Sequence, residues 1–175
     1  MKALLFCGVL SLCATCVQAG PNINIGTVYD YLDGDKSTYL KRVFNGGSST
    51  AFVRVNIFEM TFDAAGRATE HPLDNNADGA ARRTGLVASP ARLIVPANGM
   101  QALRLLYVGE RDRERYYRVR YVPVVPERED QFAVSEAERE QYKASLTAGI
   151  NIMAGYGAIF FVRPKHTRFD TKVHD

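Results

Sequence analysis

The chain has 175 residues, of which 22 are Lys or Arg and 19 are Asp or Glu, and its formal net charge is +3. This near balance argues against nucleic acid or an anionic membrane surface as the main partner, because both require a large excess of basic side chains. Hydrophobic residues make up 46% of the chain, with nine Tyr, nine Phe and no Trp, a composition that favours β-strands.

The first residues have the pattern of a secretory signal. Lys2 precedes an apolar run that continues to Val17, and the sequence Val17-Gln18-Ala19 offers a small-x-small cleavage site before Gly20. We therefore predict a signal peptide at residues 1–19. A retained membrane anchor is the alternative, but the run is shorter than the roughly 20 residues that span a bilayer. We expect no membrane insertion after cleavage.

All the cysteines lie inside this leader: Cys7, Cys13 and Cys16. The mature chain would then contain none, which argues against disulfides, a thiol nucleophile and a cysteine metal site. Lipid attachment to one of these cysteines is a further alternative. Leu12 and Thr15, which precede Cys13 and Cys16, do not complete the usual lipid-attachment pattern.

The mature chain reads as short strands separated by turn sequences such as Asp33-Gly34 and Asn45-Gly46. In residues 51–60, for example, Val53, Val55 and Ile57 alternate with polar residues, as in a half-buried strand. Residues 63–85 lack periodicity and are predicted as a loop that could hold one short strand. The predicted strands are 22–32, 38–44, 51–60, 86–90, 91–96, 100–108 and 116–124.

Residues 127–145 interrupt this rhythm with a charged segment. Ser135 followed by Glu138 resembles a helix capping box, but a mobile charged loop is an equal alternative. Residues 146–164 then form the last predicted strand. In its first half the row Leu146, Ala148, Ile150 and Ile152 is apolar at strand spacing.

Several short strands without a long helix predict an all-β domain at residues 20–165. About seven antiparallel strands favour an immunoglobulin-like β-sandwich over a closed barrel.

Catalytic and metal-binding patterns are missing from the sequence. His71, His166 and His174 do not have the spacing of a metal-ligand set, and the carboxylate clusters lie among arginines without apolar surroundings that would shift a pKa. We therefore expect no enzymatic activity, no metal and no cofactor.

Arginines on the polar side of two predicted strands are more informative: Arg104, Arg118 and Arg120. One interpretation is an ordinary solvated sheet face. The other is a docking surface for a chain terminus or an acidic partner, because a guanidinium group can bind a carboxylate through two hydrogen bonds.

Two stretches carry a family resemblance: "LVASPARLIVPANGMQALRLLYVGERDRERYYRVRYVPV", from Leu86 to Val124, and "GAIFFVRP", from Gly157 to Pro164. With Ser89, Pro90, Pro96, Gln101 and Arg104 in the family's order, the chain resembles the amino-terminal domain of periplasmic pilus-assembly chaperones of the chaperone-usher pathway. Within these it is more similar to the alternate group, which serves the common pilus and CS1-like pili.

The resemblance implies a function. Such chaperones donate their last strand to the incomplete immunoglobulin fold of a pilus subunit and deliver the subunit to an outer-membrane usher. It therefore implies periplasmic localisation, pilus subunits (pilins or an adhesin) and the usher as partners, and Leu146, Ala148, Ile150 and Ile152 as donor residues. The alternative for this row is packing inside the chain's own sandwich.

The chain also departs from the conventional chaperones. They hold the subunit's terminal carboxylate with an Arg and a Lys, whose positions here fall near Tyr29 and Ile159, neither of them basic. Arg163 matches a position associated with the contact between two domains. Residues 166–175 are expected to begin a linker to a second domain that this chain lacks.

A secreted adhesin-like or carbohydrate-binding β-sandwich is the alternative function. A pilin itself would normally carry a polar donor extension and often a cysteine pair, and the mature chain has neither.

Overall fold

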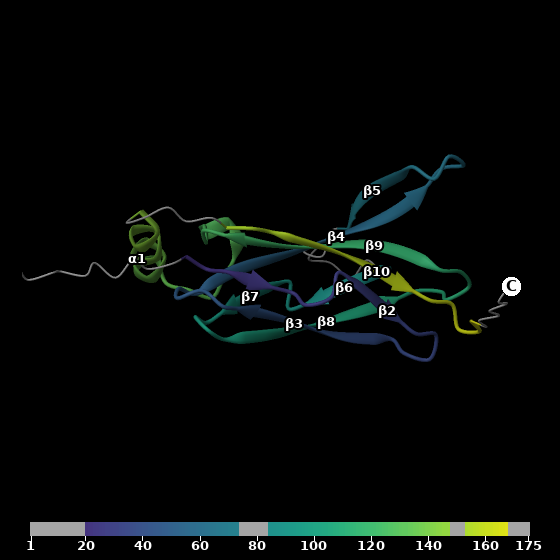
Figure 1. Ribbon diagram of the computed structural model, residues 1–175, viewed down its shortest axis with the longest axis horizontal. Coiled ribbons are helices and arrows are strands. Elements are labelled where there is room, and N and C mark those ends of the chain that lie inside the picture. Colours follow the sequence, from purple (N-terminus) through teal and green to yellow (C-terminus); the bar gives the residue numbers. More distant parts are fainter. Residues whose placement is uncertain (1–19, 74–83, 148–152, 168–175) are drawn as a thin grey trace, which may run out of the picture.

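The computed structural model describes residues 20–73, 84–147 and 153–167, and the predicted signal peptide lies outside them. Two sheets pack face to face (Figure 1). The four-stranded sheet has the order β1 (Ile23–Asn24), β3 (Thr38–Asn45), β8 (Met100–Val108), β6 (Gly85–Ser89). The six-stranded sheet has the order β2 (Tyr29–Leu32), β10 (Tyr156–Val162), β9 (Arg115–Val124), β4 (Ala51–Phe62), β5 (Ala68–Leu73), with β7 (Arg92–Val95) also paired to β4. The predicted all-β sandwich is confirmed.

Two predicted features of the strands need correction. The predicted strand 22–32 is two strands in different sheets, and the chain changes sheet near Gly26, whose positive φ of 68° suits glycine. The pairing is also not wholly antiparallel, because β2 runs parallel to β10. The predicted strands on either side of Pro90 also lie in different sheets, β6 in one and β7 in the other.

Alternation along β9 shows how the sheets form their core. Tyr117, Val119 and Tyr121 point inward and are at most 1% exposed, whereas Arg118 and Arg120 point outward. Burial of apolar side chains stabilises the fold by about 25 cal/mol per Å² of area removed from water. This face of β9 therefore packs against the second sheet.

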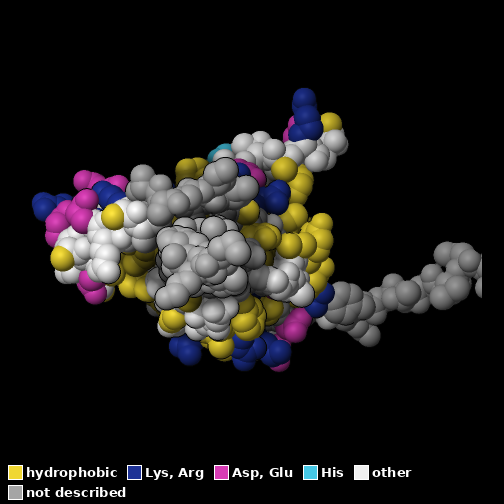
Figure 2. Space-filling model, turned by 60° about the vertical axis from the view of Figure 1, so that its left-hand side comes forward, with side chains coloured by type: hydrophobic (Ala, Val, Ile, Leu, Met, Phe, Trp, Pro, Cys, Tyr) yellow, Lys and Arg dark blue, Asp and Glu magenta, His cyan; other side chains and the backbone are white. Residues whose placement is uncertain are grey.

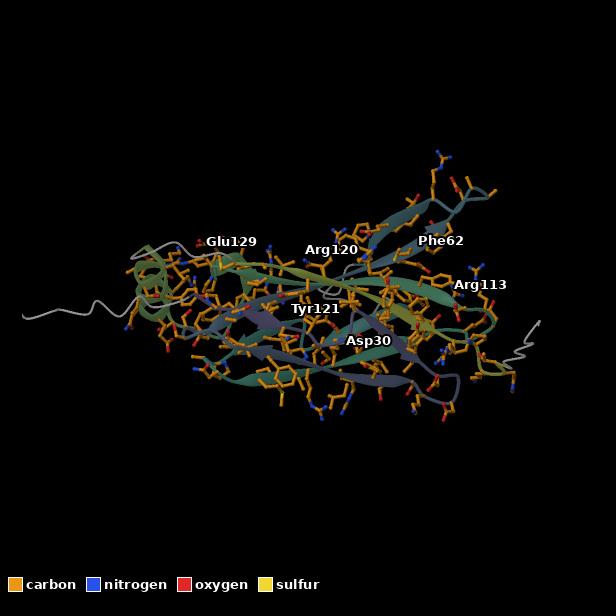
Figure 3. All side chains as sticks on the ribbon, in the orientation of Figure 1. Asp30, Phe62, Arg113, Arg120, Tyr121 and Glu129 are labelled. Atoms are coloured by element: carbon orange, nitrogen blue, oxygen red, sulfur yellow. The ribbon has the colours of Figure 1, made fainter. Side chains whose placement is uncertain are left out.

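A charged pair also lies between the sheets. Lys41 of β3 donates a hydrogen bond of 2.6 Å to Asp30 of β2, and both residues are at most 3% exposed. Thr27 and Tyr39 donate to the same carboxylate, and this burial beside Asp30 raises the pKa of Tyr39 to about 12. Figure 3 shows Asp30 between the two layers, near Tyr121. The pair joins the two sheets at this point.

Strands β4 and β5 form a hairpin that projects from the sandwich (Figure 1). Six residues of each strand are in register, from Ile57 opposite Leu73 to Phe62 opposite Ala68. The segment 63–85 is predicted as a loop that could hold one short strand, and β5 is such a strand. Its residues 74–83 lie outside the described part of the chain.

The charged segment forms a short 3-10 helix, Arg128–Asp130, followed by α1 (Glu136–Thr147), so the helical alternative is confirmed. The Glu138 carboxylate accepts a hydrogen bond of 2.7 Å from the Ser135 backbone N–H, and the Glu138 N–H donates to the Ser135 hydroxyl. This capping box also lowers the pKa of Glu138. Aromatic rings of Phe132 and Tyr142 pack edge-on against Phe52 of β4 and attach this segment to the end of the sandwich.

Candidate functional site

The beginning of β10 leaves part of a sheet edge without a neighbour. Along one side, β10 pairs with β9 from Tyr156 to Val162. Along the other side, its register with β2 begins only at Ile159. Within the described residues, 156–158 therefore have no strand on that side. An edge with free backbone N–H and C=O groups can pair with a strand of another chain.

The predicted donor row enters the sheet here, but the predicted strand 146–164 is wrong at its beginning. Leu146 lies in α1 and packs, half-buried, against the cluster of Phe52, Phe132 and Tyr142. Its strand spacing in the sequence thus does not correspond to a strand in the structure. Ala148, Ile150 and Ile152 lie outside the described residues, so their donor role stays a prediction.

Two of the predicted arginines lie together beside this edge. Arg118 and Arg120 project from the outward face of β9, and both contact Glu70 of β5, at 3.2 and 2.5 Å. The Arg120 guanidinium also lies 4.4 Å from the centre of the Phe58 ring. Figure 3 shows Arg120 at the base of the projecting hairpin, and Figure 2 shows basic and acidic side chains close together there.

Arg104 does not join them. It lies on β8 of the four-stranded sheet, between the buried Leu103 and Leu105, and therefore points outward from the opposite side of the sandwich. The three arginines do lie on the non-core side of their strands, as predicted, but they do not form one surface. Sequence alternation identifies the outward side of a strand but not the sheet to which the strand belongs.

The opposite end of β10 is held by an arginine that no sequence pattern predicted. Arg111 donates hydrogen bonds to the backbone carbonyls of Leu32, Asp33, Lys36 and Arg163, at 2.7 to 3.1 Å. It joins the turn after β2 to the end of β10. Only the fold brings these carbonyls together, and in the sequence Arg111 is one of several arginines in a charged turn.

Arg163 lies beside Arg111, which donates a hydrogen bond to its backbone carbonyl. The Arg163 guanidinium is 2.7 Å from the Asp33 carboxylate and 4.5 Å from the centre of the Tyr31 ring. Tyr31 in turn stacks on Phe161 at 4.7 Å and begins a row of rings across the outward face. The row continues through Tyr116 to Phe62, with ring centres 5.6 and 5.3 Å apart. The end of β10 therefore presents an aromatic surface next to Arg163.

Other site types have no counterpart in the described ranges. In residues 20–73, 84–147 and 153–167, no three His, Cys, Asp or Glu side chains come together as metal ligands do. The one α-helix in these ranges, α1, is too short and too polar to cross a membrane.

Known proteins similar to this chain are fimbrial chaperones. A probable fimbrial chaperone, EcpB, of Escherichia coli O1:K1 is 27% identical over 169 residues, which cover 95% of this chain and 64% of that protein. EcpB of Escherichia coli O7:K1 is 25% identical over 162 residues, again over 64% of its length. The chain thus spans less than two thirds of these relatives. No family model matches it.

Solved structures show the same fold. The class 5 fimbriae chaperone CfaA superposes with a TM-score of 0.63 at 21% identity, covering 85% of this chain and 59% of CfaA. The resemblance is confirmed: the chain is similar to the amino-terminal part of fimbrial chaperones. A chaperone–tip subunit complex, CsuC–CsuE of the archaic Csu pili of Acinetobacter baumannii, matches at a TM-score of 0.56 and 14% identity. The chaperone-like sandwich is therefore the framework for the site described above.

Proposed function

We propose that this protein is a periplasmic chaperone that binds a pilus subunit by donating a strand and delivers it to an outer-membrane usher. The observation that carries the proposal is the partly unpaired start of β10, directly after an apolar row at strand spacing, in a chain similar to fimbrial chaperones. One structurally similar protein was solved as a chaperone-tip adhesin complex, which supports a subunit as the partner.

Strand addition explains why these features belong together. A subunit that lacks a strand exposes an apolar groove, and the missing strand must offer free backbone groups and apolar side chains at every second position. The start of β10 offers the backbone groups. Ala148, Ile150 and Ile152 offer the side chains. Leu146 would stand at the beginning of this row, where α1 holds it against the chain's own aromatic cluster.

Helix α1 would then set where the donor segment begins. The helix is attached to the sandwich through Tyr142 and ends at Thr147, directly before Ala148, so only Leu146 of the row lies within it. β10 holds the other end of the segment from Tyr156 onward. A segment fixed at both ends loses less conformational entropy on binding than a free tail, which favours capture.

Arg118 and Arg120 are the proposed contacts for the subunit's terminal carboxylate. The conventional anchor positions, Tyr29 and Ile159, pair with one another in the structure, and Ile159 also pairs with Arg118. A guanidinium group therefore lies in the same row, one strand further along the sheet. This placement supports a shifted carboxylate site on β9.

Arg163 remains a proposed interdomain contact, and residues 166–175 remain a proposed linker. Support comes from the position of Arg163, directly after β10 and beside the aromatic row, where a following domain would meet the sandwich.

Co-expression with candidate pilins, followed by purification, tests the function. We expect one-to-one complexes of the chain with a subunit, recovered from the periplasm. Recovery of free subunits, together with intact pilus assembly in a strain that lacks this protein, would contradict the proposal. Binding of glycans without any subunit complex would favour the adhesin-like alternative.

The arginine contacts make a separate prediction. Arg118→Ala should weaken subunit capture about 10-fold or more, because charge-assisted hydrogen bonds contribute about 1.5–3 kcal/mol each. Arg104→Ala is the matched control, since it removes the same charge from the opposite face of the sandwich. Affinity can be measured by competition for a refolding subunit. An equal loss in both variants would contradict a specific site on β9.

A further inference from the structure

The Arg118 and Arg120 pair already holds a carboxylate of the chain itself. The two oxygens of Glu70 are divided between them: one accepts from Nε of Arg118 at 3.2 Å, and the other accepts from a terminal nitrogen of Arg120 at 2.5 Å. This is the arrangement in which two guanidinium groups clamp one carboxylate.

A hollow of about 400 Å³ adjoins this clamp. Glu70, Arg118 and Arg120 form its charged side, and Val122, Tyr156 and two glycines complete it. Gly157 lies against the arginine: a Cβ atom there would lie 3.4 Å from Cδ of Arg118, in ordinary van der Waals contact. The hollow therefore extends from the clamp to the start of β10, and a group that arrives along β10 can reach both guanidinium groups.

Among the described side chains, the charges at the clamp are not balanced. Two positive side chains share one negative side chain, and each guanidinium carries five N–H donors, of which the contacts with Glu70 use few. All three side chains are partly exposed, at 26% to 46%, so water and a ligand can reach them. A second carboxylate would meet an attractive field, and it would compete with Glu70 for the same donors.

Glu70 can also move away more readily than the arginines. It lies on β5, which among the described residues pairs with β4 alone at the edge of the sheet and projects from the sandwich (Figure 1). The arginines lie on β9, which is paired on both sides by β4 and β10. The clamp therefore joins the well-supported strand β9 to the less supported strand β5.

We propose that Glu70 is an internal competitor at this site, which occupies the arginine pair until the carboxylate of a polypeptide terminus displaces it. The identity of that polypeptide as a pilus subunit rests on the proposed function. Displacement exchanges one set of ion pairs for another and removes the side-chain contacts that join β5 to β9, while β4 stays paired to β9. Glu70 thus protects the arginine pair against weak anions, and binding of the correct terminus loosens β5.

The test uses two small probes and the whole chain without any subunit. N-acetylglycine carries a free carboxylate, and N-acetylglycinamide is its neutral counterpart. Both are titrated while the NMR signals of the Nε–Hε groups of Arg118 and Arg120 are followed. Wild type is compared with Glu70→Gln, which keeps the shape but removes the charge. Asp63→Asn is the matched control, because it removes one charge from the same hairpin at the Arg67 ion pair.

We expect Glu70→Gln to bind N-acetylglycine about two- to fivefold more tightly than wild type, the range that corresponds to losing a partly exposed competing ion pair. Asp63→Asn should match wild type, the amide should cause no shift, and Arg118→Ala/Arg120→Ala should abolish binding. Equal affinities of wild type and Glu70→Gln would overturn the proposal.

A second measurement does not depend on any variant. In the wild-type protein, saturation with N-acetylglycine should shift the Glu70 side-chain carboxyl carbon signal as its partners are lost. An unchanged signal at saturation would overturn the displacement. Because no pilin is present, these results are independent of the co-expression experiment, and either can fail alone.

Discussion

Replacing Ile150 or Ile152 with aspartate is expected to abolish subunit capture while the isolated domain still folds. In strand addition these side chains would enter an apolar groove, and an unpaired carboxylate there costs several kcal/mol. Capture should therefore fall by about 100-fold or more. Complex yield in co-expression measures the loss, and thermal unfolding of the free protein checks the fold.

Asn151→Asp is the matched control for these variants. It adds the same charge to the same segment, but at a position that alternates with the apolar row. Near-normal capture by Asn151→Asp would support insertion of one face only. If Ile150→Asp or Ile152→Asp instead unfolds the isolated domain, those side chains pack inside the chain's own sandwich and the donor assignment is contradicted.

Lys41→Met is expected to lower the free energy of unfolding by about 3–5 kcal/mol. The substitution leaves the Asp30 carboxylate buried between the sheets without its cation, and removing one partner of a buried pair has an effect of this size. Chemical denaturation monitored by circular dichroism measures it.

Lys36→Met provides the comparison. Lys36 is also paired with an aspartate, Asp33, but the pair is exposed and its atoms are 3.8 Å apart, so we expect a change below about 0.5 kcal/mol. A similar small effect for Lys41→Met would show that Asp30 finds water or another partner when the lysine is removed.

The Lys41 pair also shows where sequence patterns mislead. In β3, Lys41, Val43 and Asn45 are buried, whereas Leu40 and Phe44 are about half exposed. The alternation is real, but its polar side faces the core. Hydrophobicity alone assigns the faces of this strand the wrong way round, because the compensating carboxylate comes from β2 in the other sheet.

Residues around Leu146 give the second example. A row with apolar residues at every second position is typical of a strand, yet α1 includes its first member. Local periodicity could not resolve this, because the helix depends on contacts of Tyr142 with Phe52, a residue 90 positions earlier in the chain.

Four features could be predicted from sequence, because each depends on neighbouring residues: the strand-rich composition, most of the alternating segments, the capping box before α1 and the resemblance to pilus chaperones. The assignment of each strand to one of the two sheets required the folded molecule. The fold thereby separated Arg104 from Arg118 and Arg120, brought Glu70 to the latter two and gathered four carbonyls around Arg111. Pairing between distant strands depends on the burial of the whole core, and no short stretch of sequence contains that information.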